Sequence, residues 1–418
     1  MENIKKSVEL LLKYILTFIK WLGVAVIIGA VGGAVGSAFH MLVEMVTELR
    51  NEYSAIIFLL PVGGVLIAAM YNLFKKKGKI DTNRVIEAVR EDEKVPLIML
   101  PLIFISTVIS HLLGASVGRE GAALQIGGSI GYNFGKLLKL NERNMHIIIM
   151  AGMSSVFAAL FGTPIAAAIF ALEVINVGVF KYAGLLACIM SATVAYGVST
   201  LFSVEPVRFA ITFTDVVSAD VMAKAVLLSL LCAVVSIVFL TAVKKCEHYT
   251  DKLIKNNYVR AFFGGVVIVI LTLLAGCGDY NGAGMGIIEN AISGNAKPWA
   301  FALKIIFTAV SIAAGFRGGE IVPTLFIGAT FGCAVSHFVG LDAGVAAAIG
   351  MISLFCCVVN CPIASVLLAA ELFGGEGMIY FAVVSAVSYM MSGCFGLYKS
   401  QKIIYSKLDT GYIDKNTI

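Results

Sequence analysis

Charged residues are scarce in this sequence. Only 14% of its 418 residues are Asp, Glu, Lys or Arg, whereas 59% are hydrophobic. A soluble domain usually carries about 25% charged residues, so the composition excludes an ordinary soluble domain. Apolar runs recur along the whole chain, and most reach the length of about 17–25 residues that crosses a hydrocarbon layer. They predict a multi-pass membrane protein with about ten spans.

The sequence also lacks the spacings of common catalytic and metal sites. Its nine cysteines show no zinc-type pairing, and no H-E-x-x-H string occurs. The Gly-x-Gly-Asp string at 276–279 matches intramembrane aspartyl proteases. That chemistry needs two aspartates sharing a proton, and no second aspartate lies well inside an apolar run. We therefore expect no enzymatic activity, no metal and no cofactor.

The few charges gather in loops and near the ends. Basic segments lie at 75–79, 135–143, 244–260 and 399–407. By the positive-inside rule, these segments and both termini are predicted to be cytoplasmic. The first apolar run lacks a small-residue cleavage site, which predicts a retained helix and not a signal peptide. The dispersed charge argues against a nucleic-acid partner.

The chain contains an internal repeat. The stretches 152–173 and 350–371 match without a gap, and nine of their 22 positions are identical. The segments before them, 104–127 and 305–328, also share glycine, threonine and serine positions. Shared apolar residues alone would be weak evidence, but shared Gly, Pro, Thr and Glu positions indicate two related halves.

This repeat predicts the organisation of the chain. We expect a single transmembrane domain over 1–418, with repeat halves at about 12–203 and 222–398 and a short tail at 399–418. Internal repeats are typical of secondary transporters and related channels, in which each half contributes a broken helix near the bilayer midplane.

One broken helix is predicted around Arg119 and Glu120, which stand among glycines between apolar stretches. Glycine weakens helices, so one helix should end near Gly118 and another begin near Gly121. The start of the second helix exposes unpaired N–H groups and a positive dipole end. In hydrocarbon these groups need a partner, and an anion is a suitable one. Residues 318–323 repeat the arrangement, with a proline suited to the first helical turn.

Glu120 has two interpretations at this position. An ionised carboxylate at a helix N-terminus competes with a free anion, and a protonated one swings away, which makes Glu120 a gate or a proton carrier. Ionisable groups inside a membrane mark functional paths by default. The alternative is a structural ion pair between Arg119 and Glu120.

Four strings in order resemble motifs of the CLC family of chloride channels and anion/proton antiporters. They are "GREGAALQIGG" (118–128), "FGTPIAAAIFALE" (161–173), "GGEIVP" (318–323) and "KIIYSKL" (402–408). Their order and spacing fit nearly the whole chain. The resemblance implies an all-α polytopic fold of two inverted-topology repeats, a homodimer with one pore per subunit, and an anion path lined by helix N-termini.

The resemblance also implies roles for single residues. Glu120 matches the gating glutamate, and Gly121 lies beside it. Ile321 and Val322 match positions whose backbone N–H groups hold the anion. Tyr405 matches the tyrosine whose hydroxyl faces the anion; without the resemblance it would be an interfacial aromatic anchor.

Two departures from the family concern the inner side of the path. The family's inner serine motif is missing, and its place falls within 78–89, where Thr82 or Asn83 could supply a polar group. In classical exchangers a second glutamate near the position of Glu173 relays protons, but here Val174 follows. Family channels and fluoride exporters both have a neutral residue there, so the choice between channel and exchanger stays open.

A third departure concerns the anion. The Gly-Gly-Glu string that includes Glu320 resembles the fluoride-exporting branch, but Ala122 and Val322 stand where that branch tends to have threonine. Glu320 is either a second gate or a salt-bridge partner of Arg317, and the sequence favours the salt bridge. Arg119 and Glu320 are thus expected to support the site.

Together these features predict transport of small inorganic anions through a glutamate-gated pore. The expected activity is that of a voltage- or pH-gated chloride channel or a chloride/proton antiporter, and the alternative is a fluoride/proton antiporter. The expected partners are a halide, protons, membrane lipid and a second copy of the chain. We expect a bacterial inner membrane, because no regulatory domain is recognised after the last apolar run.

Overall fold

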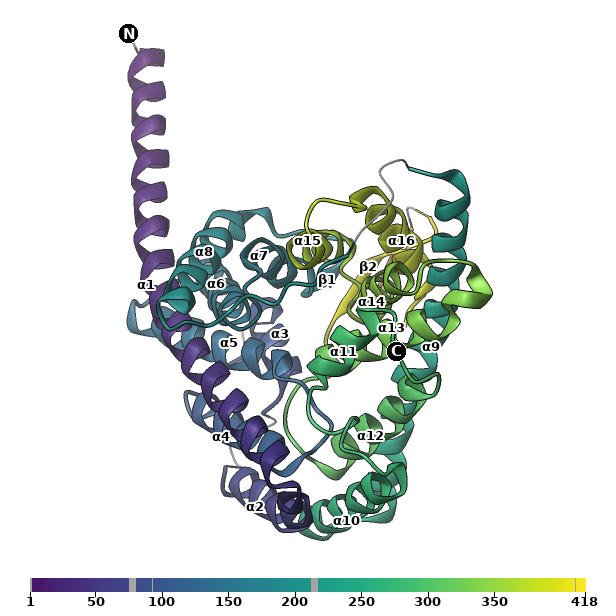
Figure 1. Ribbon diagram of the computed structural model, residues 1–418. Coiled ribbons are helices and arrows are strands. Elements are labelled where there is room, and N and C mark those ends of the chain that lie inside the picture. The colour runs from purple at the N-terminus through teal and green to yellow at the C-terminus, as the bar shows by residue number, and fades with distance from the viewer. Residues whose placement is uncertain (1, 75–79, 92, 212–216, 410) are drawn as a thin grey trace.

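The computed structural model describes residues 2–74, 80–91, 93–211, 217–409 and 411–418. Most of the described chain is helical, which confirms the all-α prediction (Figure 1). The basic segment at 75–79 lies outside the described residues.

The order of helices repeats along the chain. The first series is α1 (Glu2–Glu52), α2 (Leu60–Leu73), α3 (Thr82–Arg90), α4 (Met99–Leu113), α5 (Glu120–Leu137), α6 (Glu142–Phe161), α7 (Pro164–Glu173) and α8 (Leu185–Leu201). The second series is α9 (Ala219–Leu253), α10 (Asn257–Ala275), α11 (Met285–Ile292), α12 (Ala300–Ala314), α13 (Ile321–Val339), α14 (Ala343–Val359), α15 (Pro362–Phe373) and α16 (Met378–Met391). Counterparts have similar lengths: α4 and α12 both have 15 residues, and α5 and α13 have 18 and 19.

Two apolar runs that look continuous in the sequence are broken in the structure. The run at 147–172 divides into α6 and α7, and the run at 344–370 divides into α14 and α15. The first break has Gly162 and the second Asn360, each in the left-handed conformation that ends a helix. Each following helix begins with proline, whose missing N–H costs nothing at a first helical position. Hydropathy alone therefore overestimates the length of these two helices.

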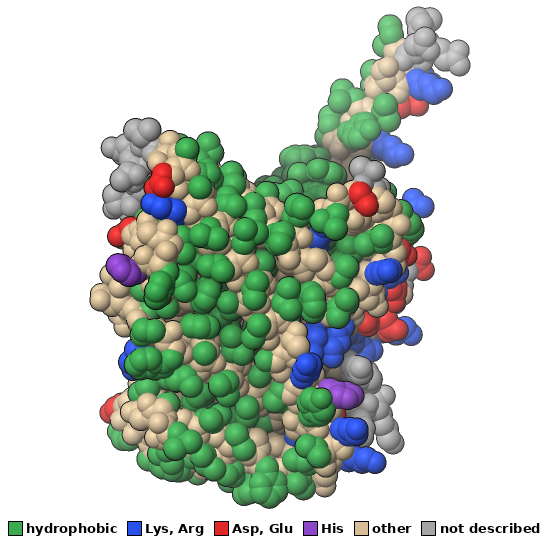
Figure 2. Space-filling model, turned by 90° about the vertical axis from the view of Figure 1, so that its right-hand side faces the viewer, with side chains coloured by type: hydrophobic (Ala, Val, Ile, Leu, Met, Phe, Trp, Pro, Cys, Tyr) green, Lys and Arg blue, Asp and Glu red, His purple; other side chains and the backbone are tan. Residues whose placement is uncertain are grey.

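The outer surface has the character of a lipid-facing one. Among the described residues, seven helices are long and apolar enough to cross a membrane. Shorter apolar helices, including α4, α7 and α12, lie between them in the sequence. Figure 2 shows that apolar side chains dominate the face formed around α9 and α10, while charged side chains gather at its edges. The first turns of α1 project from the body (Figure 1).

Reciprocal hydrogen bonds join the two halves. The Ser116 N–H donates to the Ser311 hydroxyl at 2.9 Å. At the equivalent place the Arg317 N–H donates to the Ser110 hydroxyl at 3.1 Å. Because each half satisfies the irregular backbone of the other, the breaks in the helices are stable inside the membrane.

A second reciprocal pair caps two helices. The Glu371 carboxylate, at the end of α15, accepts from the N–H groups of Ile165 and Ala166 at 3.0 and 2.8 Å. The Glu173 carboxylate, at the end of α7, accepts from Ile363 and Ala364 at 3.2 and 2.9 Å. Each carboxylate thus neutralises the positive start of the counterpart helix.

A small sheet, which the sequence did not predict, holds the tail. Strand β2 (Lys402–Tyr405) pairs in parallel with β1 (Asn176–Val177) and antiparallel with β3 (Tyr412–Asn416). The tail is thereby attached to the loop that follows α7.

Candidate functional site

The starts of three helices meet between the halves. Gly118 and Gly319, which precede α5 and α13, exchange two backbone hydrogen bonds of 2.6 and 2.7 Å. The Thr82 hydroxyl, at the start of α3, lies 3.4 Å from the Gly121 carbonyl oxygen and accepts a hydrogen bond from the Gln125 side chain at 3.1 Å. Three positive helix ends therefore face one small region.

The Glu120 carboxylate fills part of that region. Its side chain is fully buried, and Oε2 accepts from the Arg119 N–H at 2.9 Å. The N–H of Val322, in the first turn of α13, faces the same carboxylate. The other oxygen, Oε1, has no hydrogen-bond partner. A negative group thus occupies the point at which backbone N–H groups from both halves converge, which is where a free anion would bind.

Glycines make this close approach possible. A Cβ on Gly319 would lie 2.4 Å from the Gly121 nitrogen, and one on Gly121 would lie 2.9 Å from the Gly319 Cα. A Cβ on Gly118 would lie 2.7 Å from Oε2 of Glu120. Side chains at these positions would separate α5 from α13, so the backbone itself forms the wall of the site.

Arg119 forms the ion pair that the sequence left open as an alternative. Its Nε lies 3.6 Å from Oε1 of Glu120, and its side chain is 12% exposed. The ion pair does not exclude a gate at Glu120, since the Glu120 carboxylate contacts both the Arg119 guanidinium and the helix starts. Movement of Glu120 would leave this guanidinium at the floor of a cavity.

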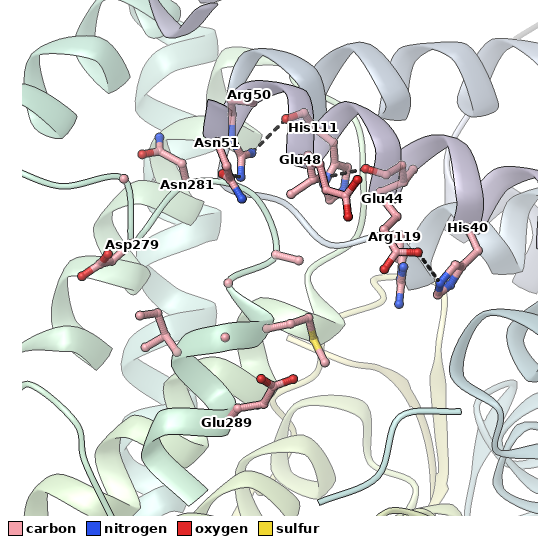
Figure 3. A pocket seen from close by; sticks show the side chains of 18 of the residues that line it. His40, Glu44, Glu48, Arg50, Asn51, His111, Arg119, Asp279, Asn281 and Glu289 are labelled. Atoms are coloured by element: carbon pink, nitrogen blue, oxygen red, sulfur yellow. Dashed lines mark hydrogen bonds and ion pairs between the residues drawn. The ribbon is translucent and has the colours of Figure 1, made fainter. Parts of the chain in front are cut away.

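That cavity, called here the Arg119 vestibule, has a volume of about 1090 Å³. Its charged and ionisable lining groups are His40, Glu44, Glu48, Arg50, His111, Arg119, Glu205, Asp279 and Glu289. Figure 3 shows the side chains of α1 along one wall and Glu289 on the opposite one. His40 and Glu44 form an ion pair of 3.3 Å when the imidazole is protonated.

A second cavity, called here the Glu320 vestibule, has a volume of about 460 Å³. It is lined by Glu320, by α3, by the C-terminal part of α9 and by the segment 397–400. The Arg119 vestibule instead contacts Thr272 at the C-terminal end of α10. The Glu320 vestibule lies beside the end of α9, and α10 begins soon after that end. The 19 residues of α10 span about 28 Å, so the two vestibules open near opposite ends of α10. The Gly118–Gly319 pair separates them.

The expected salt bridge between Glu320 and Arg317 is absent. The Arg317 guanidinium lies over the Tyr71 ring, 4.0 Å from its centroid, and no ion pair joins it to Glu320 among the described residues. Glu320 immediately precedes α13 and lines the second vestibule. It is therefore a carboxyl group at the wall of this vestibule and not a partner of Arg317.

The structure does not bring Tyr405 to the site. Its side chain is 45% exposed on β2, and its ring packs against Tyr412 with centroids 5.9 Å apart. Tyr398, seven positions earlier, is only 3% exposed, and its hydroxyl has no hydrogen-bond partner. Its neighbours Leu397 and Lys399 line the Glu320 vestibule together with Glu320. Sequence reasoning missed Tyr398, which stands in the string "GLYKS" (396–400).

The structure separates the two candidates for the missing inner motif. Asn83 accepts from the Ser400 N–H at 3.0 Å and so faces the tail. Thr82 is buried beside Gly121. Ile321 and Val322, predicted to hold the anion through their N–H groups, are buried at the start of α13.

Comparison with known proteins identifies relatives over most of the chain. The family model described as voltage gated chloride channel matches residues 63–393. A "Chloride/fluoride channel protein" of Pseudomonas syringae pv. tomato is 34% identical over 395 residues, covering 93% of this chain and 87% of that protein. An "H(+)/Cl(-) exchange transporter ClcA" of Vibrio campbellii is 25% identical over 403 residues, covering 87% of this chain and 84% of that protein.

Solved structures share the fold. A CLC-type fluoride/proton antiporter superposes with a TM-score of 0.88 at 28% identity, covering 92% of this chain and 98% of the other. A slow cyanobacterial Cl−/H+ antiporter superposes with a TM-score of 0.77 at 21% identity, covering 89% of this chain and 94% of the other. The second likeness concerns the fold alone.

Proposed function

The chain belongs to the voltage-gated chloride channel (CLC) family, and we propose that it exchanges a small halide for protons with Glu120 as the gate. Members of this family are multi-pass membrane transporters and channels and not enzymes, and this chain is a CLC-type anion/proton transporter. The halide, the gate and the other site residues are the proposal. Its main support is the Glu120 carboxylate, which is buried at the converging helix starts.

The gate acts by competition. Ionised Glu120 accepts from the Arg119 N–H and faces the Val322 N–H, so a free anion cannot use those donors. Protonation removes the charge that holds the carboxylate there, and the side chain turns away. The anion then binds to N–H groups of Gly121, Ile321 and Val322. Backbone N–H groups hold the anion, and the Arg119 guanidinium stays on the side of the Arg119 vestibule, so the anion is held weakly enough to leave.

Exchange also needs a proton path toward the second vestibule. Val174 stands where classical exchangers relay protons, so that route lacks a carboxylate. Glu320 is a carboxyl group that lines the Glu320 vestibule and lies one residue beyond the Gly118–Gly319 pair. We assign the inner proton transfer to Glu320, which receives protons from Glu120 as the gate moves.

The arrangement suits fluoride better than chloride. Fluoride is the smallest halide and the strongest hydrogen-bond acceptor among them, so protonated carboxyl groups bind it well. Two such groups, Glu120 and Glu320, flank the constriction. The 34% identical relative is named for both anions, and the 28% identical structure is a fluoride/proton antiporter. Fluoride is therefore the proposed substrate, and chloride is the second candidate because the Vibrio relative exchanges chloride.

Tyr398 takes the role that the sequence assigned to Tyr405. Its hydroxyl is a buried donor without a partner, and the residues on either side of it line the vestibule of Glu320. A phenol beside an anion donates one hydrogen bond without adding a charge. A homodimer in a bacterial inner membrane, with cytoplasmic termini, completes the proposal.

The gate is tested with Glu120→Gln in liposomes. The wild-type protein should move fluoride and protons in opposite directions, whereas Glu120→Gln should move fluoride with no linked protons, because an amide carries no proton at this position. Glu142→Gln, which changes an exposed carboxylate at the start of α6, should retain normal coupling. Proton coupling that survives in Glu120→Gln would refute the assignment of the gate.

A further inference from the structure

The segment that carries Tyr398 has no regular structure of its own. Helix α16 ends at Met391 and β2 begins at Lys402, and the residues between them form turns. Tyr398 is nevertheless almost fully buried. Irregular backbone at such depth needs partners for its polar groups, so the surroundings of this segment determine where the phenol lies.

Two helices supply some of these partners. The Val358 carbonyl, near the end of α14, accepts from the Leu397 N–H at 2.9 Å. The Asn360 side chain donates to the Phe395 carbonyl at 2.9 Å. From α9, the Lys244 ammonium donates to the Gly396 carbonyl at 2.7 Å. These contacts fix the segment before Tyr398, but not Tyr398 itself.

Further partners come from residues 417–418, which follow β3 and are called here the strap. The Thr417 hydroxyl donates to the Tyr398 carbonyl at 2.7 Å. The Thr417 N–H donates to the Gln401 carbonyl at 3.0 Å, and the Ile418 N–H donates to the Cys394 carbonyl at 2.8 Å. The strap thus spans the segment from one end to the other and contacts Tyr398 at its centre.

The Thr417 hydroxyl is well placed to fix the backbone of Tyr398. Thr417 is only 7% exposed, and its side chain lies against Gly396, where an added Cβ would be 2.8 Å from the threonine methyl. The Tyr398 carbonyl also accepts from the Gln401 N–H at 2.9 Å and closes the turn that follows the phenol. Loss of the hydroxyl would leave this carbonyl with one donor and free the turn to rotate.

We propose that Thr417 is a positioning residue for transport, which holds the Tyr398 hydroxyl toward the anion through its bond to the Tyr398 carbonyl. The proposal rests on the function assigned above, because it needs Tyr398 to contact the anion. Its consequence is that a strap outside the membrane helices sets the anion affinity of a site within them. Leu397, Lys399 and Ser400 line the Glu320 vestibule, so the same strap also shapes the entrance on that side.

The test compares Thr417→Val with Thr417→Ser. Valine keeps the shape and removes the hydroxyl, whereas serine keeps the hydroxyl. Fluoride binding to purified protein is measured by calorimetry, and fluoride flux by liposome assay. Thr417→Val should weaken fluoride binding about fivefold, the factor that corresponds to one net hydrogen bond, and Thr417→Ser should bind as the wild type does.

A double mutant separates positioning from stability. In a Tyr398→Phe background the hydroxyl is already gone, so Thr417→Val should weaken fluoride binding no further. The proposal would be overturned if the losses of fluoride affinity from Tyr398→Phe and Thr417→Val added in the double mutant. It would also be overturned if Thr417→Val lowered the melting temperature and left the fluoride affinity unchanged. If Thr417→Val does not fold, Lys244→Gln removes the ammonium that donates to the Ile418 carbonyl of the strap as well as to the Gly396 carbonyl. The Lys244→Gln substitution should then weaken fluoride binding in the wild-type background and leave it unchanged in the Tyr398→Phe background. Any other pattern would overturn the proposal.

The wild-type flux distinguishes the two levels of the argument. Wild-type protein that moves no fluoride or chloride would refute the proposed function. If the wild-type protein moves fluoride and Thr417→Val has the same fluoride affinity and flux, only the role of the strap is refuted.

Discussion

The reciprocal caps at α7 and α15 should contribute strongly and unequally to stability. Glu173 and Glu371 each accept two backbone N–H bonds of 2.8–3.2 Å at the start of the counterpart helix. A hydrogen bond to a charged group contributes about 1.5–3 kcal/mol, so each cap contributes about 3–6 kcal/mol to the free energy of unfolding. Glu173 is only 8% exposed, and Glu371 is partly exposed.

These exposures decide the order of the two effects. Water replaces part of the lost bonding when Glu371 is truncated, so Glu371→Ala should cost near 3 kcal/mol, the lower end of the estimate of about 3–6 kcal/mol. Glu173→Ala leaves the buried Ala364 N–H and the partly buried Ile363 N–H without partners and should cost near the upper end. Glutamine keeps one acceptor oxygen, so each Glu→Gln variant should fall between the wild type and the alanine variant.

The measurement is unfolding by SDS titration of purified protein in detergent micelles, followed by circular dichroism. Glu142→Ala, at an exposed helix start, serves as the control and should change the free energy of unfolding by less than about 1 kcal/mol. Losses below about 1 kcal/mol for both Glu173→Ala and Glu371→Ala would show that the caps contribute little. A larger loss for Glu371→Ala than for Glu173→Ala would refute the argument from burial.

Two further predictions concern the backbone of the site and the tail. Gly319→Ala places a Cβ 2.4 Å from the Gly121 nitrogen. It should weaken halide binding at least about fivefold in calorimetry, because overpacking costs about 1–3 kcal/mol. Gly197→Ala, which has nothing within 4 Å of the added Cβ, should bind as the wild type does, and equal affinities of the two variants would contradict the close approach. Burial lowers the pKa of Lys407 in the tail from 10.5 to about 8. Its charged form therefore destabilises the fold below pH 8, and the free energy of unfolding should rise as the pH increases from 8 to 10.5, by at most about 3 kcal/mol. Lys407→Met should show a smaller rise in SDS titrations at each pH, because burial lowers the pKa of Lys244 to about 8 as well and that contribution stays, and an identical pH profile would contradict the assignment.

The sequence predicts the broken helices well, because glycine and proline have positional meaning. The predicted start of a helix near Gly121 agrees with α5, which begins at Glu120. Gly162 and Pro362 mark two further breaks, which hydropathy alone does not reveal. The local signal was present in both cases.

The position of the tyrosine could not be read from the sequence. Tyr398 and Tyr405 are seven residues apart, and each is followed directly by one lysine and one serine. The choice between them depends on contacts made by Val358, Lys244 and Thr417, which are distant in sequence. Irregular backbone of this kind has no periodicity from which burial could be inferred. The partner of Arg317 was missed for a similar reason, since its stacking on Tyr71 depends on how α2 packs.

The central claim is that halide movement and proton movement are coupled through Glu120. The most direct measurement uses wild-type protein in liposomes that hold a fluoride gradient and no proton gradient, with external pH recorded as fluoride leaves. The account predicts that fluoride efflux drives protons into the liposomes against a growing proton gradient, so that the external solution becomes alkaline. Fluoride efflux without any linked change in external pH, at clamped membrane potential, would contradict the account and identify a channel.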